Sequence, residues 1–216
     1  KKDKMDEKKI IIFTGPSLSI EEASKILKAD YREPIQRGDI LKAIQDSPDI
    51  IGIIDGVFHQ SPAVGHKEII EAINKGITVV GGGSMGALRA SELDSLGMKG
   101  IGYVYNEYSS GNIESDDDVA IVFDSTTGEP FSEALVNVDY KFKEAVKSGI
   151  INNDERKELI SVAKSIYYPK RTYYNIFKNS SIDEEKKEEL IDFIVELVDV
   201  KKQDAIAVLE YIKKLT

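Results

Sequence analysis

The residues with the clearest chemical potential lie in the segment 77–92, ITVVGGGSMGALRASE. An apolar run rich in β-branched residues leads into consecutive glycines and Ser84, and the residues that follow have helical spacing. This pattern predicts a strand, a tight turn and a helix. Gly82, Ser84 and Gly86 have the G-x-S-x-G spacing, in which a sharp glycine turn places a serine hydroxyl at the start of a helix.

Ser84 has three interpretations. As a nucleophile it needs a nearby general base, and a backbone N–H such as that of Met85 would stabilise an oxyanion, an effect of roughly a hundred- to a thousand-fold per donor. As part of an anion-binding turn, Gly82, Gly83 and Gly86 would bring N–H groups and the helix dipole to a phosphate or carboxylate without a covalent step. As a simple helix N-cap, Ser84 would have only a structural role. The motif alone leaves all three open.

The two histidines of the chain, His59 and His66, both follow the predicted strand 50–54. Near a helix N-terminus His66 would be disfavoured from charging, and it would therefore be available as a neutral base. A hydrogen-bonded surface histidine is the alternative for either residue. Asp55 could orient a histidine or Lys67, or it could only cap the turn after the strand. We therefore include all four residues with Ser84 as catalytic candidates.

The elements that must position these residues predict an α/β fold. Buried strands are expected at 10–14, 50–54 and 77–81, with weaker candidates at 101–105 and 119–123. Helices of ordinary length separate them, which is typical of a Rossmann-like or flavodoxin-like parallel sheet with helices on both faces. Ser19 with Glu22, and Asp39, are expected to begin the first two helices.

In an open parallel sheet ligands bind at the carboxyl ends of the strands, where loops converge. We expect a crevice there, and we assign to substrate or anion binding the residues Gly15, Pro16, Ser17, Arg37, Gly82, Gly83, Met85, Gly86, Arg89 and Glu92. Arg89 and Glu92 would by default form a local ion pair one helical turn apart, whereas Arg89 could instead bind a carboxylate or phosphate bidentately.

Near residue 130 the pattern becomes helical, with helices expected at 139–148, 153–167, 183–197 and 201–215. Ser181 with Glu184 should cap the third of these. We divide the chain into a disordered or vector-derived N-terminus at 1–9, an α/β core at 10–130 and a helical C-terminal lobe at 131–216. Two further segments have open interpretations. The carboxylate run 114–118 suits either a divalent cation or a solvated turn, and the aromatic and basic segment 167–178 suits either a nucleic-acid or peptide partner or an amphipathic core helix.

Composition limits the function classes. The formal net charge of -9 disfavours nucleic acid and anionic membrane surfaces as partners. The chain has no cysteine, which excludes disulfides, thiolate metal sites and a persulfide carried by this chain. No apolar run approaches the length of a membrane span, and the start lacks the apolar segment of a signal peptide. We expect a cytoplasmic protein without a metal or cofactor.

Several short blocks together resemble one family, the TfuA-like proteins, which are partners of YcaO enzymes in peptide-backbone thioamidation. The blocks occur in order along the chain: GPSL at 15–18, RGD at 37–39, DGVF at 55–58, HKE at 66–68, SMGALRASE at 84–92, DDDVA at 116–120 and SEALVN at 132–137. The resemblance implies that Ser84, Arg89, His66, Lys67 and Asp55 line the family's site. It also implies a role with a YcaO protein, which activates a backbone amide with ATP so that sulfur replaces oxygen. Known settings are the thioglycine of methyl-coenzyme M reductase in methanogens and bacterial thioamide peptides.

Two functional hypotheses follow from the resemblance and the composition. Because this chain cannot hold sulfur on cysteine, it could release sulfide from the thiocarboxylate of a ubiquitin-like sulfur-carrier protein, with Ser84 as nucleophile. Alternatively it is a non-catalytic protein that docks on YcaO and binds an anionic group at the glycine turn. The peptide substrate would be reached through YcaO, and a homodimer is left open.

Overall fold

A computed structural model describes residues 6–58, 61–124 and 126–216. The chain forms two compact units. The first extends to residue 112 and also includes residues 201–216, and the second comprises residues 113–200. The sequence-based division placed the boundary near residue 130 and the last helix in the helical lobe, so the structural units differ from it at both points.

The first unit is built on a five-stranded sheet in the order β2-β1-β3-β4-β5, in which every neighbouring pair is parallel. The strands are β1 (Ile10–Phe13), β2 (Asp30–Arg32), β3 (Ile50–Ile53), β4 (Thr78–Gly82) and β5 (Lys99–Ile101). This is the doubly wound order of flavodoxin-like folds, whose switch point lies between β1 and β3. The predicted Rossmann-like α/β class is confirmed.

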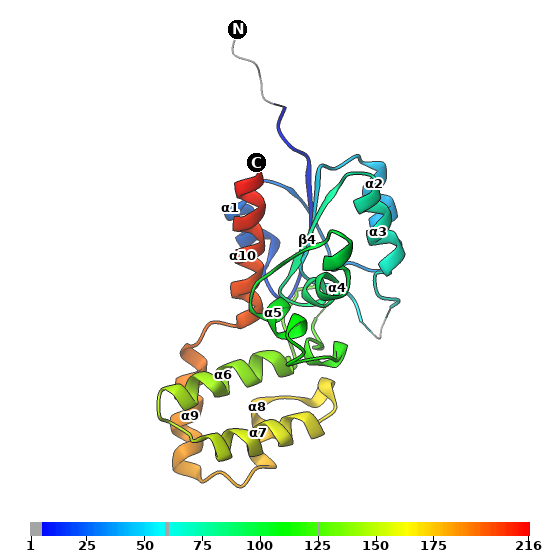
Figure 1. Cartoon of the computed structure of the whole chain (residues 1–216). Coiled ribbons are helices and arrows are strands. Elements are labelled where there is room, and N and C mark those ends of the chain that lie inside the picture. The colour runs from blue at the N-terminus through cyan, green and yellow to red at the C-terminus, as the bar shows by residue number, and fades with distance from the viewer. Residues whose placement is uncertain (1–5, 59–60, 125) are drawn as a thin grey trace. The chain divides into compact units, whose positions relative to one another are not determined.

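Helices cover both faces of the sheet (Figure 1). On one face lie α1 (Ile20–Ile26) and α10 (Val200–Leu215), and on the other α2 (Asp39–Gln45), α3 (His66–Asn74) and α4 (Met85–Leu93). The last helix belongs to the sheet because its apolar face is buried with strand residues in one core cluster, which includes Ile12, Ile50, Val80, Ala205, Val208, Leu209 and Ile212.

Two strand predictions were wrong. The run 101–105 is split, because β5 ends at Ile101 and the short helix α5 (Tyr103–Ser109) begins after Gly102. Asp204 stabilises the start of α5, because its carboxylate accepts the N–H groups of Tyr103 at 2.9 Å and Val104 at 2.8 Å. In the run 119–123 only Phe123 forms a β-bridge, to Pro130. A short apolar run has no periodicity that separates a strand from a buried loop.

The predicted helix starts have mixed outcomes. Ser19 caps α1 as expected, with its Oγ accepting the Glu22 N–H at 3.2 Å. Gly38 rather than Asp39 is the N-cap of α2, and the Asp39 carboxylate accepts the Gln36 N–H instead. At the other end of α4, the short 3-10 helix η1 (Asp94–Leu96) ends at Gly97, and β5 begins at Lys99.

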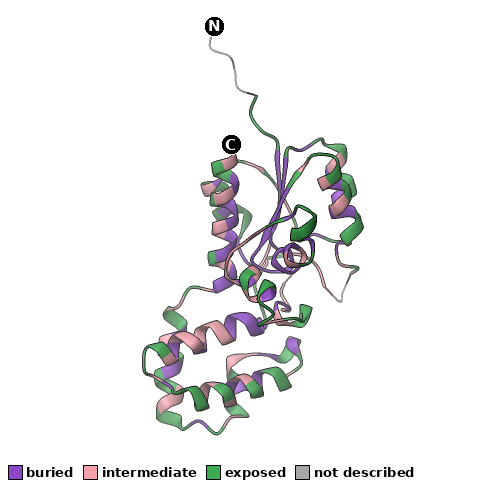
Figure 2. Ribbon diagram, in the orientation of Figure 1, coloured by how far each residue is buried: buried purple, intermediate pink, exposed green. Residues whose placement is uncertain are grey.

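The second unit is helical, with α6 (Leu135–Lys147), α7 (Asn153–Ser165), α8 (Tyr173–Lys178) and α9 (Glu184–Glu196) and the 3-10 turns η2 (Asp116–Asp118) and η3 (Tyr168–Lys170). Its core contains Phe142, Leu159, Ile176 and Leu190, and Figure 2 shows the alternation of buried and exposed helix faces. The expected cap of α9 was wrong: Asp183 accepts the Lys186 N–H at 2.8 Å, whereas Ser181 donates its hydroxyl to Glu158. The reason is that Ser181 lies two residues before the cap position and finds a carboxylate partner, Glu158, on α7.

Candidate functional site

The predicted turn before Ser84 is present at the carboxyl end of β4. Gly83 has φ +82°, a left-handed conformation that favours glycine, and Ser84 is the N-cap residue of α4. The Ser84 side chain is only 7% exposed and makes no capping hydrogen bond within the described part of the chain. No side-chain hydrogen bond among the described residues therefore supports the interpretation of Ser84 as a simple helix cap. The hydroxyl of this buried residue remains available to a ligand.

The start of α4 lies against the ends of β3 and β4. A Cβ at Gly86 would collide with the carbonyl oxygen of Ile53, and a Cβ at Gly81 would collide with that of Gly86. The Gly86 N–H donates to Ile54 O at 3.2 Å, while no described group accepts the N–H of Met85. These glycines are therefore required for close packing of helix on sheet, and they leave one helix N-terminal donor beside Ser84.

Asp55 follows β3 and is 3% exposed. Its Oδ2 accepts the N–H groups of Gly15 at 2.8 Å and Ser17 at 3.1 Å, and its Oδ1 accepts the Ser17 hydroxyl at 2.6 Å. Burial raises the pKa of the Asp55 carboxyl, while the positive charge of Lys201 and these hydrogen bonds act in the opposite direction. The loop after β1, which contains Gly15, Pro16 and Ser17, thus already binds an internal carboxylate.

Asp55 and Ser84 lie at adjacent strand ends. A Cβ at Gly83 would lie 3.2 Å from Ile54 Cγ2, and a Cβ at Gly56 would lie 2.8 Å from Met85 Cγ. The residues that flank Asp55 therefore contact the residues that flank Ser84. The expected convergence of loops at the carboxyl edge of the sheet is present for these two strands.

Sequence reasoning missed a contribution of α10 to this edge. Lys201 is 4% exposed and near enough to Asp55 for its charge to affect that carboxyl, and its backbone O would lie 3.4 Å from a Cβ at Gly83. The sequence contained a signal of this contribution, the helical spacing i, i+3, i+4, i+7 of Lys201, Asp204, Ala205 and Val208. This spacing places two charged residues on the apolar face of a helix. Buried charges on such a face require partners.

The histidine candidate His66 pairs with Glu92. His66 is the first residue of α3, and its Nε2 lies 2.7 Å from Glu92 Oε2. Glu92 also accepts from Arg89 Nη1 at 2.8 Å, as expected for the local pair, and Arg89 Nε donates to Val64 O at 3.0 Å. The carboxylate that orients His66 is therefore Glu92 and not Asp55. Lys67 is exposed and makes no ion pair with a described residue.

The structure does not bring His66 to Ser84. Glu92 lies two turns beyond Ser84 on α4, roughly 12 Å along the helix axis. No hydrogen bond joins His66 and Ser84 in the described ranges, so the expected pair of nucleophile and base is not assembled through His66. The other candidate base, His59, lies outside the described residues.

Glu68 of the HKE block and the predicted binding residue Arg37 both contact backbone groups of other segments. Glu68, buried in the HKE block, accepts N–H groups from Gly38, Ile40 and Gly65, each between 3.1 and 3.2 Å. It therefore caps α3 and binds the start of α2, so the HKE segment is linked to the RGD segment through backbone hydrogen bonds. Arg37 is exposed, and its backbone N–H donates to Pro62 O at 2.9 Å.

With the geometry described, the chain can be compared with known proteins. The model of the family described as TfuA-like protein matches residues 55–172. The chain belongs to the TfuA-like family. The matched region of this TfuA-like protein starts at Asp55 and includes Ser84, His66 and Arg89, but it does not include the Ser17 loop or Lys201. A comparison with curated proteins gives no match.

The described residues also bear on metal binding, on the acidic run 114–118 and on membrane insertion. Across residues 6–58, 61–124 and 126–216, no cluster of three or more His, Cys, Asp or Glu side chains is suited to hold a metal ion. The acidic run of this TfuA-like protein forms η2, in which Ser115 accepts the Asp117 N–H. None of the described helices has the length and apolar character needed to span a membrane.

Proposed function

We propose that this TfuA-like protein is an accessory protein for YcaO-dependent peptide-backbone thioamidation, such as formation of the thioglycine of methyl-coenzyme M reductase. In this proposal it supplies sulfide by hydrolysing the thiocarboxylate at the C-terminus of a ubiquitin-like sulfur-carrier protein. The observation that carries the proposal is the buried N-cap residue Ser84 of α4, whose hydroxyl makes no capping hydrogen bond within the described residues. Family membership supports the thioamidation role.

The proposed reaction has two steps. Ser84 Oγ attacks the thiocarboxylate carbonyl carbon, its proton passes to a base and then to sulfur, and the C–S bond breaks to release hydrosulfide, HS⁻, which takes up the proton set free in the second step to give hydrogen sulfide. Water then hydrolyses the resulting ester, so that the carrier leaves as a carboxylate and the serine regains its proton. The N–H of Met85 and the helix dipole would stabilise the oxyanion.

The base in this proposal is His66 or His59. His66 would have to leave Glu92, to which it is bonded at 2.7 Å, before it could reach Ser84. Asp55 or Lys67 was expected to orient the base. Asp55 instead holds the Ser17 loop, so we assign it to the structure of the crevice.

A second candidate function is a non-catalytic protein that docks on YcaO and binds an anionic group at the Ser84 turn. The observation that favours it is the separation of His66 from Ser84, because anion binding needs only the hydroxyl and the helix N-terminus. In this alternative Arg89 and Glu92 act only as a link between α3 and α4.

The decisive experiment measures sulfide release from a thiocarboxylated carrier protein by the wild-type chain and by Ser84→Ala. Ser91→Ala serves as a matched control, since Ser91 lies on the same helix and its hydroxyl only donates to Leu88 O. Hydrolysis requires release by wild type and the control, with loss of at least about a hundred-fold in Ser84→Ala. If neither wild type nor variant releases sulfide while both stimulate thioamidation by YcaO, the hydrolase proposal fails and the docking function remains.

A further inference from the structure

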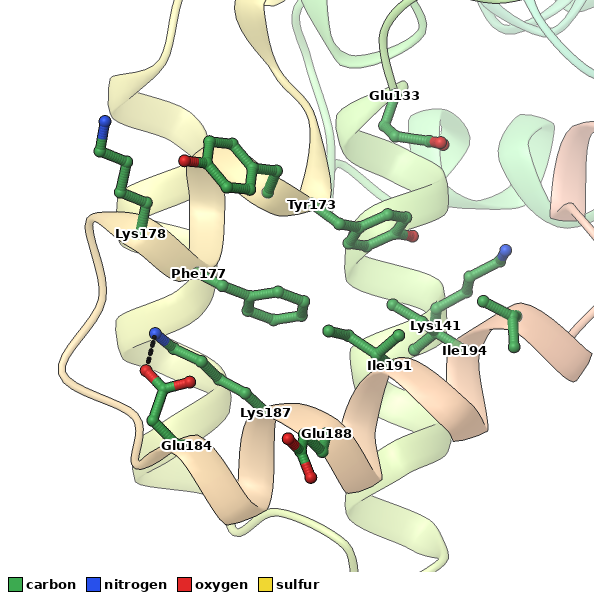
Figure 3. A pocket seen from close by; sticks show the side chains of 12 residues that line it. Glu133, Lys141, Tyr173, Phe177, Lys178, Glu184, Lys187, Glu188, Ile191 and Ile194 are labelled. Atoms are coloured by element: carbon green, nitrogen blue, oxygen red, sulfur yellow. Dashed lines mark hydrogen bonds and ion pairs between the residues drawn. The ribbon is translucent and has the colours of Figure 1, made fainter.

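The proposed function does not use a groove on the second unit. It has a volume of about 640 Å³, and Tyr173 and Phe177 of α8 lie in it with Ile191 and Ile194 of α9 (Figure 3). Val195 of α9 also lines the groove. Tyr173 and Phe177 are stacked with ring centroids 6.2 Å apart, which makes this part of the groove rigid and aromatic. All lining residues belong to the second unit.

The groove is bordered by large apolar side chains that are open to solvent. Tyr174 is 72% exposed, Val195 is 68% exposed and Ile191 is 40% exposed. Scattered apolar residues are ordinary on a surface, but these three line one groove and are therefore contiguous. Ile191 and Val195 are four residues apart on α9, so they form one apolar ridge along the helix.

The charges at the groove are of both signs. Lys187 is paired with Glu184 at 3.0 Å, the dashed contact in Figure 3. Lys178 of α8, Lys141 of α6 and Glu188 of α9 also line the groove, and within the described ranges none of the three has an ion-pair partner. The face thus offers two lysines and a glutamate to an occupant.

We propose that the groove binds a second copy of this chain, with the α9 ridge of each copy lying in the groove of the other. A helix laid in an apolar groove is held by side chains at i and i+4, which is the spacing of Ile191 and Val195. A two-fold interface must be self-complementary, so that a surface provides both the ridge and its receptor. This face does, because the ridge is itself one wall of the groove.

The charges fit the same arrangement. In the proposed dimer Glu188 of one copy would face the lysines that line the groove of the other, and the two-fold axis would repeat that contact. A foreign helix would have to supply both an apolar ridge and compensating charges, whereas a second copy already carries them. The inference is independent of the hydrolase proposal, since no residue of the Ser84 crevice is involved.

The test is the mass of the full chain in a dilution series, measured by sedimentation velocity. We expect wild type to show a reversible monomer–dimer equilibrium and Val195→Glu to be monomeric throughout. Leu96→Glu is the control, because Leu96 is an exposed apolar residue of the first unit, 54% exposed against 68% for Val195, and this variant should dimerise like wild type. Circular dichroism spectra that match wild type would show that both variants are folded.

A charge exchange tests the orientation. Lys178→Glu and Glu188→Lys should each weaken the dimer several-fold, and the double variant should recover most of the loss. A wild-type chain that stays monomeric at every concentration overturns the proposal, and so does a dimer that Val195→Glu leaves intact. Sulfide release by wild type and by Val195→Glu should be equal, so failure of this inference is distinguishable from failure of the proposed function.

Discussion

The Ser17 hydroxyl donates to Asp55 Oδ1 at 2.6 Å, across 38 residues of sequence. This contact ties the loop after β1 to the end of β3, and the N–H groups of Gly15 and Ser17 complete the environment of the carboxylate. The loop that was predicted to bind an external anion therefore binds the side-chain carboxyl group of Asp55 instead. Ser84, one strand further along, makes no side-chain capping hydrogen bond among the residues that the structure describes.

The first prediction concerns the pH dependence of stability at Asp55. Burial raises the pKa of its carboxyl in the folded protein, so the folded state binds this proton more tightly than the unfolded chain. The contribution of Asp55 to stability is then fully present below its unfolded pKa of about 4 and is lost as the pH rises through the folded pKa. In Asp55→Asn the carboxamide oxygen can accept both N–H groups and its NH2 can donate to Ser17 Oγ. Urea unfolding at a series of pH values should therefore show wild type losing stability relative to Asp55→Asn as the pH rises.

Lys201 provides the companion variant. Its positive charge opposes the rise in the Asp55 pKa, so Lys201→Met should move the loss of stability to higher pH. Superimposable pH profiles for wild type, Asp55→Asn and Lys201→Met would contradict the account of this pair.

The second prediction compares two serines at helix starts. Ser19→Ala should lower the free energy of unfolding by about 1 kcal/mol, because Ser19 Oγ accepts the Glu22 N–H. Ser84→Ala should change it by less than about 0.5 kcal/mol, because no capping bond is lost. Denaturant unfolding of both variants measures this directly. A loss at Ser84 as large as that at Ser19 would mean that the hydroxyl has a structural role after all.

The third prediction concerns the packing of α4 on the sheet. Gly86→Ala would place a methyl group on the Ile53 carbonyl oxygen, and we expect a loss of about 3 kcal/mol or failure to fold. Gly65→Ala is the matched control, since its Cβ would meet only the end of the Glu68 side chain at 3.4 Å and its φ of -83° suits alanine. The control should stay within about 1 kcal/mol of wild type. Equal stabilities of the two variants in thermal or urea unfolding would show that α4 can shift away from β3.

The fourth prediction concerns Tyr173 in the second unit. Its hydroxyl is buried and has no hydrogen-bond partner within the described part of the chain, and burial raises its pKa well above 10, so it stays neutral. Removing an unsatisfied buried hydroxyl should stabilise the protein, and we expect Tyr173→Phe to gain about 1 kcal/mol.

Tyr31→Phe is the control for that gain, because the single proton of the Tyr31 hydroxyl is shared between the backbone oxygens of Leu27 at 2.5 Å and Ala23 at 3.0 Å. It should lose about 1 kcal/mol. Urea unfolding that ranks the two variants in the opposite order would show that Tyr173 finds a partner in solution.

Much of the fold could be predicted from local pattern. The strands at β1, β3 and β4, the four long helices after residue 134 and the turn before Ser84 all follow from runs of apolar residues, helical spacing and glycine. The errors are short segments. At 101–105 the apolar run suits a strand, but the carboxylate of Asp204 accepts the first N–H groups of α5 and begins a helix there.

By itself the sequence determined the parallel α/β class, the glycine turn that precedes Ser84, the absence of cysteine chemistry and membership of the TfuA-like family. Tertiary structure alone decided which residues share the crevice and which side chains are paired. It brought Lys201 to Asp55, paired His66 with Glu92 and placed α10 on the sheet. The physical reason is that periodicity reports only neighbours within a few residues, whereas these contacts join segments 26 or more residues apart, whose meeting depends on how the whole sheet packs.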